Sequence, residues 1–145
     1  GLFDRASGQG VQIAAHLPPD WGAGYPNVWL GVSIETQEYA WRADALRALP
    51  AAIRFVSYEP ALGPLVLDLQ GLHWVICGGE SGPGYRPMAL DWARAMRDAC
   101  RLAGTAYFFK QTSGPRPGHG ATLDGATLQA YPSSDPVAST ELAFL

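Results

Sequence analysis

Polar side chains follow four short apolar stretches of the sequence, at the point where each stretch ends. Two stretches leave in the pattern Ser-x-Glu, a third in Gly-Gly-Glu-Ser, and a fourth in Lys-Gln. The residues are Ser33, Glu35, Ser57, Glu59, Gly78, Gly79, Glu80, Ser81, Lys110 and Gln111. Carboxylates, hydroxyls and an amine gathered in one place can orient a small ligand, transfer protons or hold a cation.

The four apolar stretches are typical of buried strands in a parallel sheet, because each is short, apolar on both faces and bounded by turn residues. They cover residues 28–32, 53–57, 73–78 and 105–109. Amphipathic patterns predict helices over residues 36–49, beginning after Thr36, and over 91–103. Residues 65–69 are either a short extra strand or irregular packing. Strands that alternate with helices predict an α/β fold with right-handed β-α-β crossovers.

The ends of parallel strands lie at one edge of a sheet, where α/β proteins bind their ligands. We therefore expect the polar residues to converge there, with Glu80, Glu59 and Lys110 as the first candidates for catalytic contacts. The alternative for any single glutamate is that it caps the next helix or stays solvated. Two interpretations of Arg86 stay open, namely contact with a bound anion and a surface salt bridge. The glycines from Gly78 to Gly84 favour a tight turn over a phosphate nest.

Four such β-α units amount to half of a (β/α)8 TIM-like barrel, or to a small open sheet, since a whole barrel takes about 250 residues and this chain has 145. We expect an irregular N-terminal segment, a half-barrel and a Gly/Pro-rich, partly mobile C-terminal extension, at residues 1–26, 27–112 and 113–145. A half-barrel leaves two apolar edge strands. These predict pairing with another copy or a separate N-terminal half, or cover from residues 1–26 and 112–145.

The composition narrows the function classes. A net charge of −3 and a pI near 5.5 give no electrostatic footprint for nucleic acid. No apolar run approaches a membrane span, and a signal peptide is not evident, so we expect a cytoplasmic protein. Cys77 and Cys100 lack the C-x-x-C spacing of a metal site and are expected to be buried free thiols.

Four segments carry a resemblance to a known family: Asn27–Glu35, Arg54–Pro60, Trp74–Gly82 and Phe108–Gln111. Over about residues 27–131 the chain resembles the C-terminal half of a phage-associated family of uncharacterised proteins, which are themselves similar to radical S-adenosylmethionine enzymes. The resemblance implies the back half of an S-adenosylmethionine site, with Ser33, Glu35, Ser57, Glu59 and Glu80 as candidate contacts. Tyr58 and Thr112 depart from the family pattern.

In that family the N-terminal half carries a three-cysteine motif that is expected to hold a [4Fe–4S] cluster, and this sequence does not contain the motif. The resemblance therefore implies a fragment that supplies half of a barrel ligand site and is inactive alone. The alternative is a non-catalytic module of phage or mobile-element origin that binds a small ligand or a protein.

Overall fold

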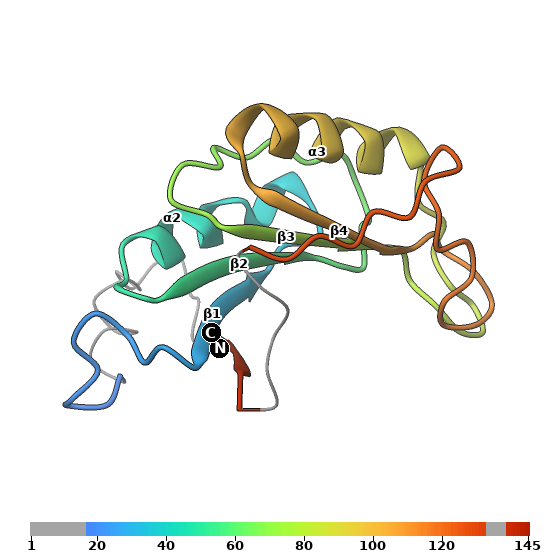
Figure 1. Ribbon diagram of the computed structural model, residues 1–145. Coiled ribbons are helices and arrows are strands. Elements are labelled where there is room, and N and C mark those ends of the chain that lie inside the picture. The colour runs from blue at the N-terminus through green and yellow to red at the C-terminus, as the bar shows by residue number, and fades with distance from the viewer. Residues whose placement is uncertain (1–16, 133–138) are drawn as a thin grey trace.

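The computed structural model describes residues 17–132 and 139–145, and its centre is a five-stranded sheet in which every strand is parallel to its neighbours (Figure 1). The strand order is β4-β3-β2-β1-β5. The strands are β1 (Val28–Ser33), β2 (Ile53–Tyr58), β3 (Trp74–Gly78), β4 (Ala106–Gln111) and β5 (Glu141–Phe144). The expected parallel α/β fold and its four strands are confirmed. The fifth strand was not predicted.

In the described residues two α-helices accompany the sheet, α2 (Trp41–Arg47) and α3 (Leu90–Ala103). The single helix expected over residues 36–49 is divided into the 3-10 turn η2 (Gln37–Tyr39) and α2. Thr36 occupies the N-cap of η2, but its side chain makes no capping hydrogen bond. The longest of these helices, α3, has 14 residues, and no helix in the described ranges has the length and apolarity to cross a membrane.

Both α-helices pack on the same face of the sheet (Figure 1). From β1 to β4 the chain steps each time to the neighbouring strand, and connections of one hand then all fall on one face. The main core lies between this face and the helices, where Val32, Val56 and Val75 meet Leu46 and Met96. Residues 59–73 connect β2 to β3 without a helix or strand, so residues 65–69 are irregular packing; Leu65 and Leu69 point into the same core.

The opposite face carries a second, smaller core made mostly of aromatic side chains. Trp29, Phe55, Trp74 and Ile76 are buried there, and Phe108 and Tyr131 pack against them. The ring of Phe55 lies across Gly31 of the neighbouring strand, where an added Cβ would come within 2.3 Å of ring atoms. Gly31 is therefore required for this aromatic layer to form.

Residues from the C-terminal extension lie along both outer edges of the four-stranded unit. β5 pairs with β1, and the segment 126–130 runs beside β4, where Phe109 N–H donates to Leu128 O at 2.7 Å and Ala130 N–H to Tyr107 O at 3.2 Å. The expected covers for the edges were a second copy, a separate N-terminal half, or residues 1–26 and 112–145. In the structure, residues of the C-terminal extension cover both edges. The mobile stretch expected within the extension falls mainly on residues 133–138, and most of the irregular N-terminal segment is residues 1–16; both lie outside the described residues.

Gly31→Ala tests the aromatic layer. We expect the free energy of unfolding to fall by about 1–3 kcal/mol, because the new methyl group must displace the Phe55 ring. Gly63→Ala is the matched control, since its Cβ would lie 3.6 Å from the Thr36 methyl carbon in ordinary contact. Urea unfolding measures both, and equal midpoints for the two variants would contradict this packing.

His73 gives the fold a pH dependence. Its Nδ1 accepts the backbone N–H of Arg54 at 2.9 Å, and burial together with the nearby Arg54 guanidinium lowers its pKa. The unfolded chain then takes up a proton near pH 6.5 that the folded chain does not, so stability falls as the pH drops below about 6.5. We expect His73→Asn, which keeps an acceptor, to flatten the stability–pH curve between neutral and mildly acidic pH.

Candidate functional site

The end of β1 is closed by the helix that follows it. Arg42 of α2 donates to the backbone oxygen of Ser33 at 2.8 Å, and the same nitrogen lies 3.5 Å from the Glu35 carboxylate. The guanidinium also lies over the ring of Tyr39, 4.4 Å from its centroid. Ser33 and Glu35, both predicted ligand contacts, therefore hold the η2–α2 segment against the sheet.

The ends of β2 and β4 meet in a polar cluster of Ser57, Glu59 and Lys110. The hydroxyl of Ser57, a residue only 2% exposed, donates to one carboxylate oxygen of Glu59 at 2.9 Å. The other oxygen of Glu59 lies 3.4 Å from Nζ of Lys110. The side chain of Glu59 is 26% exposed and that of Lys110 54%, so the ion pair faces solvent at its outer side.

Gly78 makes this cluster possible. Glu59 follows β2 and Lys110 belongs to β4, so β3 lies between them in the sheet. A Cβ at Gly78 would lie 3.3 Å from Oε2 of Glu59 and 3.5 Å from Cβ of Lys110. Because β3 ends in a residue without a side chain, the two charged groups can approach each other across it.

The end of β3 is occupied by an internal ion pair. Both carboxylate oxygens of Glu80 accept the Nε–H of Arg86, at 3.2 and 3.1 Å, and Oε1 accepts the backbone N–H of Arg86 at 2.9 Å. These hydrogen bonds from Arg86 lower the pKa of the Glu80 carboxyl. Of the two possibilities left open for Arg86, the structure has the salt bridge, and the pair fixes the turn between residues 80 and 86.

Gln111 and Gly79 join this turn to the next loop. The buried amide of Gln111 donates to Gly79 O at 3.0 Å and accepts the N–H of Gly118 at 2.6 Å. A Cβ at Gly79 would lie 2.2 Å from the backbone nitrogen of Ser113, so the two loops touch there. Ser81 forms a backbone bridge to Gly114. These predicted cofactor contacts therefore position the loops around the polar cluster.

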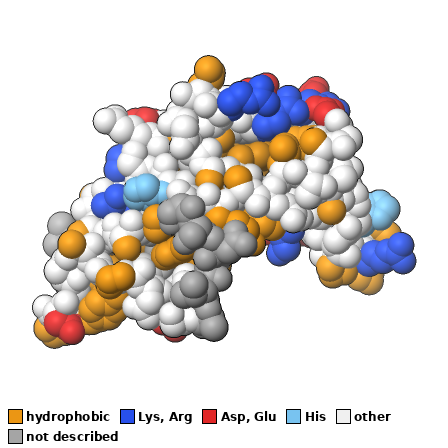
Figure 2. All heavy atoms as spheres, in the orientation of Figure 1, with side chains coloured by type: hydrophobic (Ala, Val, Ile, Leu, Met, Phe, Trp, Pro, Cys, Tyr) orange, Lys and Arg blue, Asp and Glu red, His pale blue; other side chains and the backbone are white. Residues whose placement is uncertain are grey.

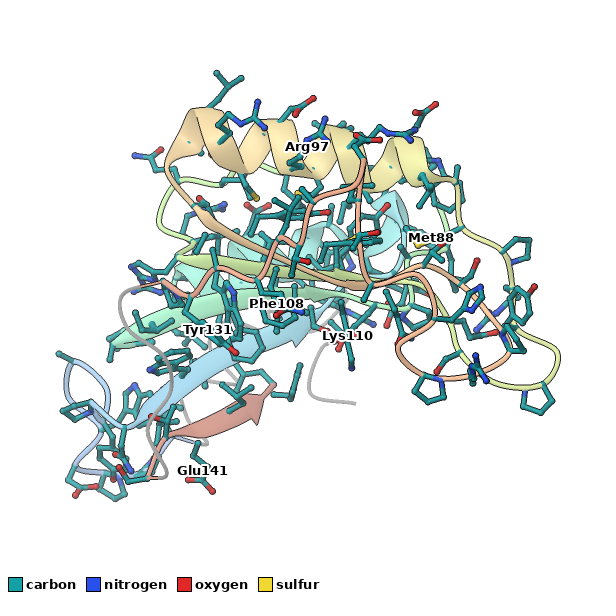
Figure 3. All side chains as sticks on the ribbon, turned by 45° about the vertical axis from the view of Figure 1, so that its right-hand side comes forward. Met88, Arg97, Phe108, Lys110, Tyr131 and Glu141 are labelled. Atoms are coloured by element: carbon teal, nitrogen blue, oxygen red, sulfur yellow. The ribbon has the colours of Figure 1, made fainter. Side chains whose placement is uncertain are left out.

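Two hollows adjoin the polar cluster. A pocket of about 270 Å³ lies at the strand ends and is lined by Glu59, Pro60, Gly79, Glu80, Ser81, Lys110 and Gln111. A cavity of about 390 Å³, called here the aromatic cavity, lies on the face opposite the helices and is lined by Glu59, Trp74, Ile76, Phe108, Lys110, Gln129, Tyr131, Leu142 and Phe144. Glu59 and Lys110 border both. Figure 3 shows Phe108, Tyr131 and Lys110 together on the side of the sheet away from α3.

The wall of the aromatic cavity is held in place by tail residues. The indole N–H of Trp74 donates to Ala130 O at 2.9 Å, and the Tyr131 ring lies 5.5 Å from that of Trp74 and 5.7 Å from that of Phe108. Sequence reasoning assigned Trp74 to the core and missed this wall. The period-2 alternation of strands could have predicted it. On this side, β3 presents Trp74, Ile76 and Gly78, and β4 presents Phe108 and Lys110.

A larger hollow, of about 580 Å³, lies at the opposite end of the strands, around residues 68–73 and 103–105. Two of its polar side chains are engaged, since Nδ1 of His73 accepts an N–H and the Thr105 hydroxyl donates to Leu72 O at 3.2 Å. Among the described residues, no group of three or more His, Cys, Asp or Glu could hold a metal ion. Charged side chains gather along α3, at the top of the view in Figure 2.

Comparison with known proteins identifies a family for this chain. A family model described as "Protein of unknown function (DUF5131)" matches residues 5–132. The chain belongs to this family. No curated protein and no solved structure matches the chain. The matched residues include β1 to β4 and the polar cluster, whereas β5 lies beyond them.

The Glu80–Arg86 pair can be tested by titration. We expect the carboxyl carbon of Glu80, followed by NMR, to titrate below the ordinary range for glutamate. Arg86→Met should raise this midpoint toward the ordinary value, because the side-chain hydrogen bonds to the charged form are lost while the backbone N–H of residue 86 remains. Arg94→Met is the control: it removes an ion pair between Arg94 of α3 and Asp124, and it should leave the Glu80 midpoint unchanged. An unchanged Glu80 midpoint in Arg86→Met would contradict the structure.

Proposed function

We propose that this chain binds a small molecule that combines a planar aromatic group with an amino-acid-like zwitterion, and that S-adenosylmethionine is the leading candidate. The observation that carries the proposal is the position of the Glu59–Lys110 pair at the border of the aromatic cavity. The pair offers a carboxylate for a ligand ammonium group and an ammonium for a ligand carboxylate.

The geometry of the pair favours exchange with a ligand. A partly exposed ion pair contributes at most about 1 kcal/mol to stability, and this one is held at 3.4 Å without a second direct bond between the partners. Lys110 can therefore turn to a ligand carboxylate at little cost. Ser57 keeps the Glu59 carboxylate in position through the bond to its other oxygen.

The aromatic cavity suits the remainder of such a ligand. Its volume of about 390 Å³ falls within the usual range of about 300–1,000 Å³ for small-molecule sites. Trp74, Phe108 and Tyr131 offer ring surfaces on which an adenine can stack, and the exposed amide of Gln129 borders the same space.

We further propose that the four-stranded unit is half of a barrel. Strands in chain order with helices on one face are the arrangement found in (β/α)8 barrels, whose inner face carries no helices. The resemblance to phage-associated proteins similar to radical S-adenosylmethionine enzymes supports the same interpretation. A separate N-terminal half or a second copy would then complete the wall of the ligand site.

The cysteines of this chain do not fit an iron–sulfur cluster. Cys77 and Cys100 are both buried in the main core, and burial raises the pKa of each thiol to about 12. Cluster ligands are exposed to the metal as thiolates. The role derived for this chain is therefore to bind and orient the ligand, and radical chemistry would depend on a cluster held elsewhere. The buried cysteines equally support a module that binds a ligand and catalyses nothing.

Calorimetry with S-adenosylhomocysteine, a stable analogue, tests the proposal. We expect Lys110→Met and Glu59→Gln each to weaken binding about 10- to 100-fold, because a charged hydrogen bond contributes about 1.5–3 kcal/mol. Gly78→Ala should also weaken it, since its methyl group would press on the Glu59 carboxylate at 3.3 Å without changing any charge.

Glu35→Gln is the matched control, because Glu35 follows the neighbouring strand β1 but pairs with Arg42 and does not line the cavity. It should bind within twofold of the unchanged chain. No binding by the unchanged chain, or equal losses in Glu35→Gln and Glu59→Gln, would contradict the proposal.

A further inference from the structure

The outer edge of β1 pairs with β5, a strand that lies outside the residues matched by the family model. The family match ends at residue 132, and β5 begins at Glu141. β5 is held mainly through main-chain bonds: Glu141 N–H donates to Asn27 O at 2.7 Å, and Leu145 N–H donates to Gly31 O at 3.0 Å. The amide of Asn27 also donates to Ser139 O at 3.3 Å.

Alternate side chains of β5 contact opposite faces of the sheet. Phe144 lies opposite Gly31 in the register, and its ring meets that of Phe55 edge-on at 5.2 Å. Leu142 and Phe144 line the aromatic cavity, while Ala143 and Leu145 pack against the main core. Because Gly31 has no side chain, the edge of β1 has room for the two aromatic rings.

β5 is nevertheless the least embedded strand of the sheet. It has four residues, of which Glu141, Leu142 and Phe144 are exposed; Leu142 is 42% and Phe144 52% exposed. Its bonds contribute about 0.5–1.5 kcal/mol each, so it can separate at a much lower free energy than β2 or β3. Separation would leave unpaired N–H and C=O groups along β1 beside the Phe55 ring.

We propose that this edge is a peptide-binding site for an extended apolar segment, and that residues 139–145 of a second copy are its occupant in trans. A second copy offers the same sequence and so makes the same contacts, which is the condition for strand exchange. The partner's Leu142 and the partner's Phe144 would then line the aromatic cavity. This proposal rests on the edge of β1 and does not depend on the identity of the small ligand.

The test uses the full chain with Ala143→Pro. Alternate residues 141 and 145 donate to β1, so the N–H of residue 143 faces the same edge, and proline removes it while keeping Leu142 and Phe144. The probe is a fluorescent peptide of residues 139–145, followed by anisotropy. We expect Ala143→Pro to bind it at least about tenfold more tightly than the unchanged chain, whose own β5 competes at high effective concentration.

Three further measurements decide the matter. The same peptide carrying Ala143→Pro should not bind. In sedimentation the unchanged chain should form dimers as its concentration rises, and the Ala143→Pro chain should form fewer. The N–H groups of Glu141 and Leu145 should exchange with solvent faster than those of β2 and β3. Equal peptide binding by both chains, equal binding of both peptides, dimers independent of the substitution, or equal exchange rates would overturn the proposal.

Discussion

The whole arrangement depends on one constraint: β1 to β4 stand in the sheet in the order in which they occur in the chain. Connections of a single hand between such neighbours place both helices and the irregular 59–73 segment on one face. Among the described residues the other face carries no helix, and its alternate side chains form the aromatic layer and, at the strand ends, the polar cluster. The same constraint explains why Glu59 and Lys110 meet, since they come from strands on either side of β3.

The glutamates at the strand ends form two kinds of ion pair, one with partners close in sequence and one with a distant partner. Glu35 pairs with Arg42 and Glu80 with Arg86, partners only seven and six residues away, and these pairs fix local turns. Glu59 has no such neighbour in sequence and instead reaches Lys110, 51 residues further along the chain. This pair joins distant segments beside a cavity, and it is the part of the edge that we propose a ligand engages.

Much of this fold was predictable from the sequence, because short apolar runs such as Trp74–Gly78 and the helical pattern of residues 91–103 have few other interpretations. The convergence of strand ends followed from parallel pairing. The choice of partner for each glutamate did not, because it depends on rotamers and on cations that the Ser-x-Glu pattern does not contain. β5 was missed since Glu141–Phe144 is short and weakly patterned, and its strand conformation depends on the edge of β1.

We propose that the face of the sheet opposite α2 and α3 binds the ligand. This proposal is tested most directly by NMR of the chain during addition of S-adenosylhomocysteine, with the indole N–H of Trp74 and the side chain of Lys110 as reporters. We expect shifts concentrated at Trp74, Phe108, Lys110 and Tyr131, with the resonances of α3 unchanged. Shifts centred on α3, or no shift at Trp74 and Lys110 at saturating ligand, would contradict it.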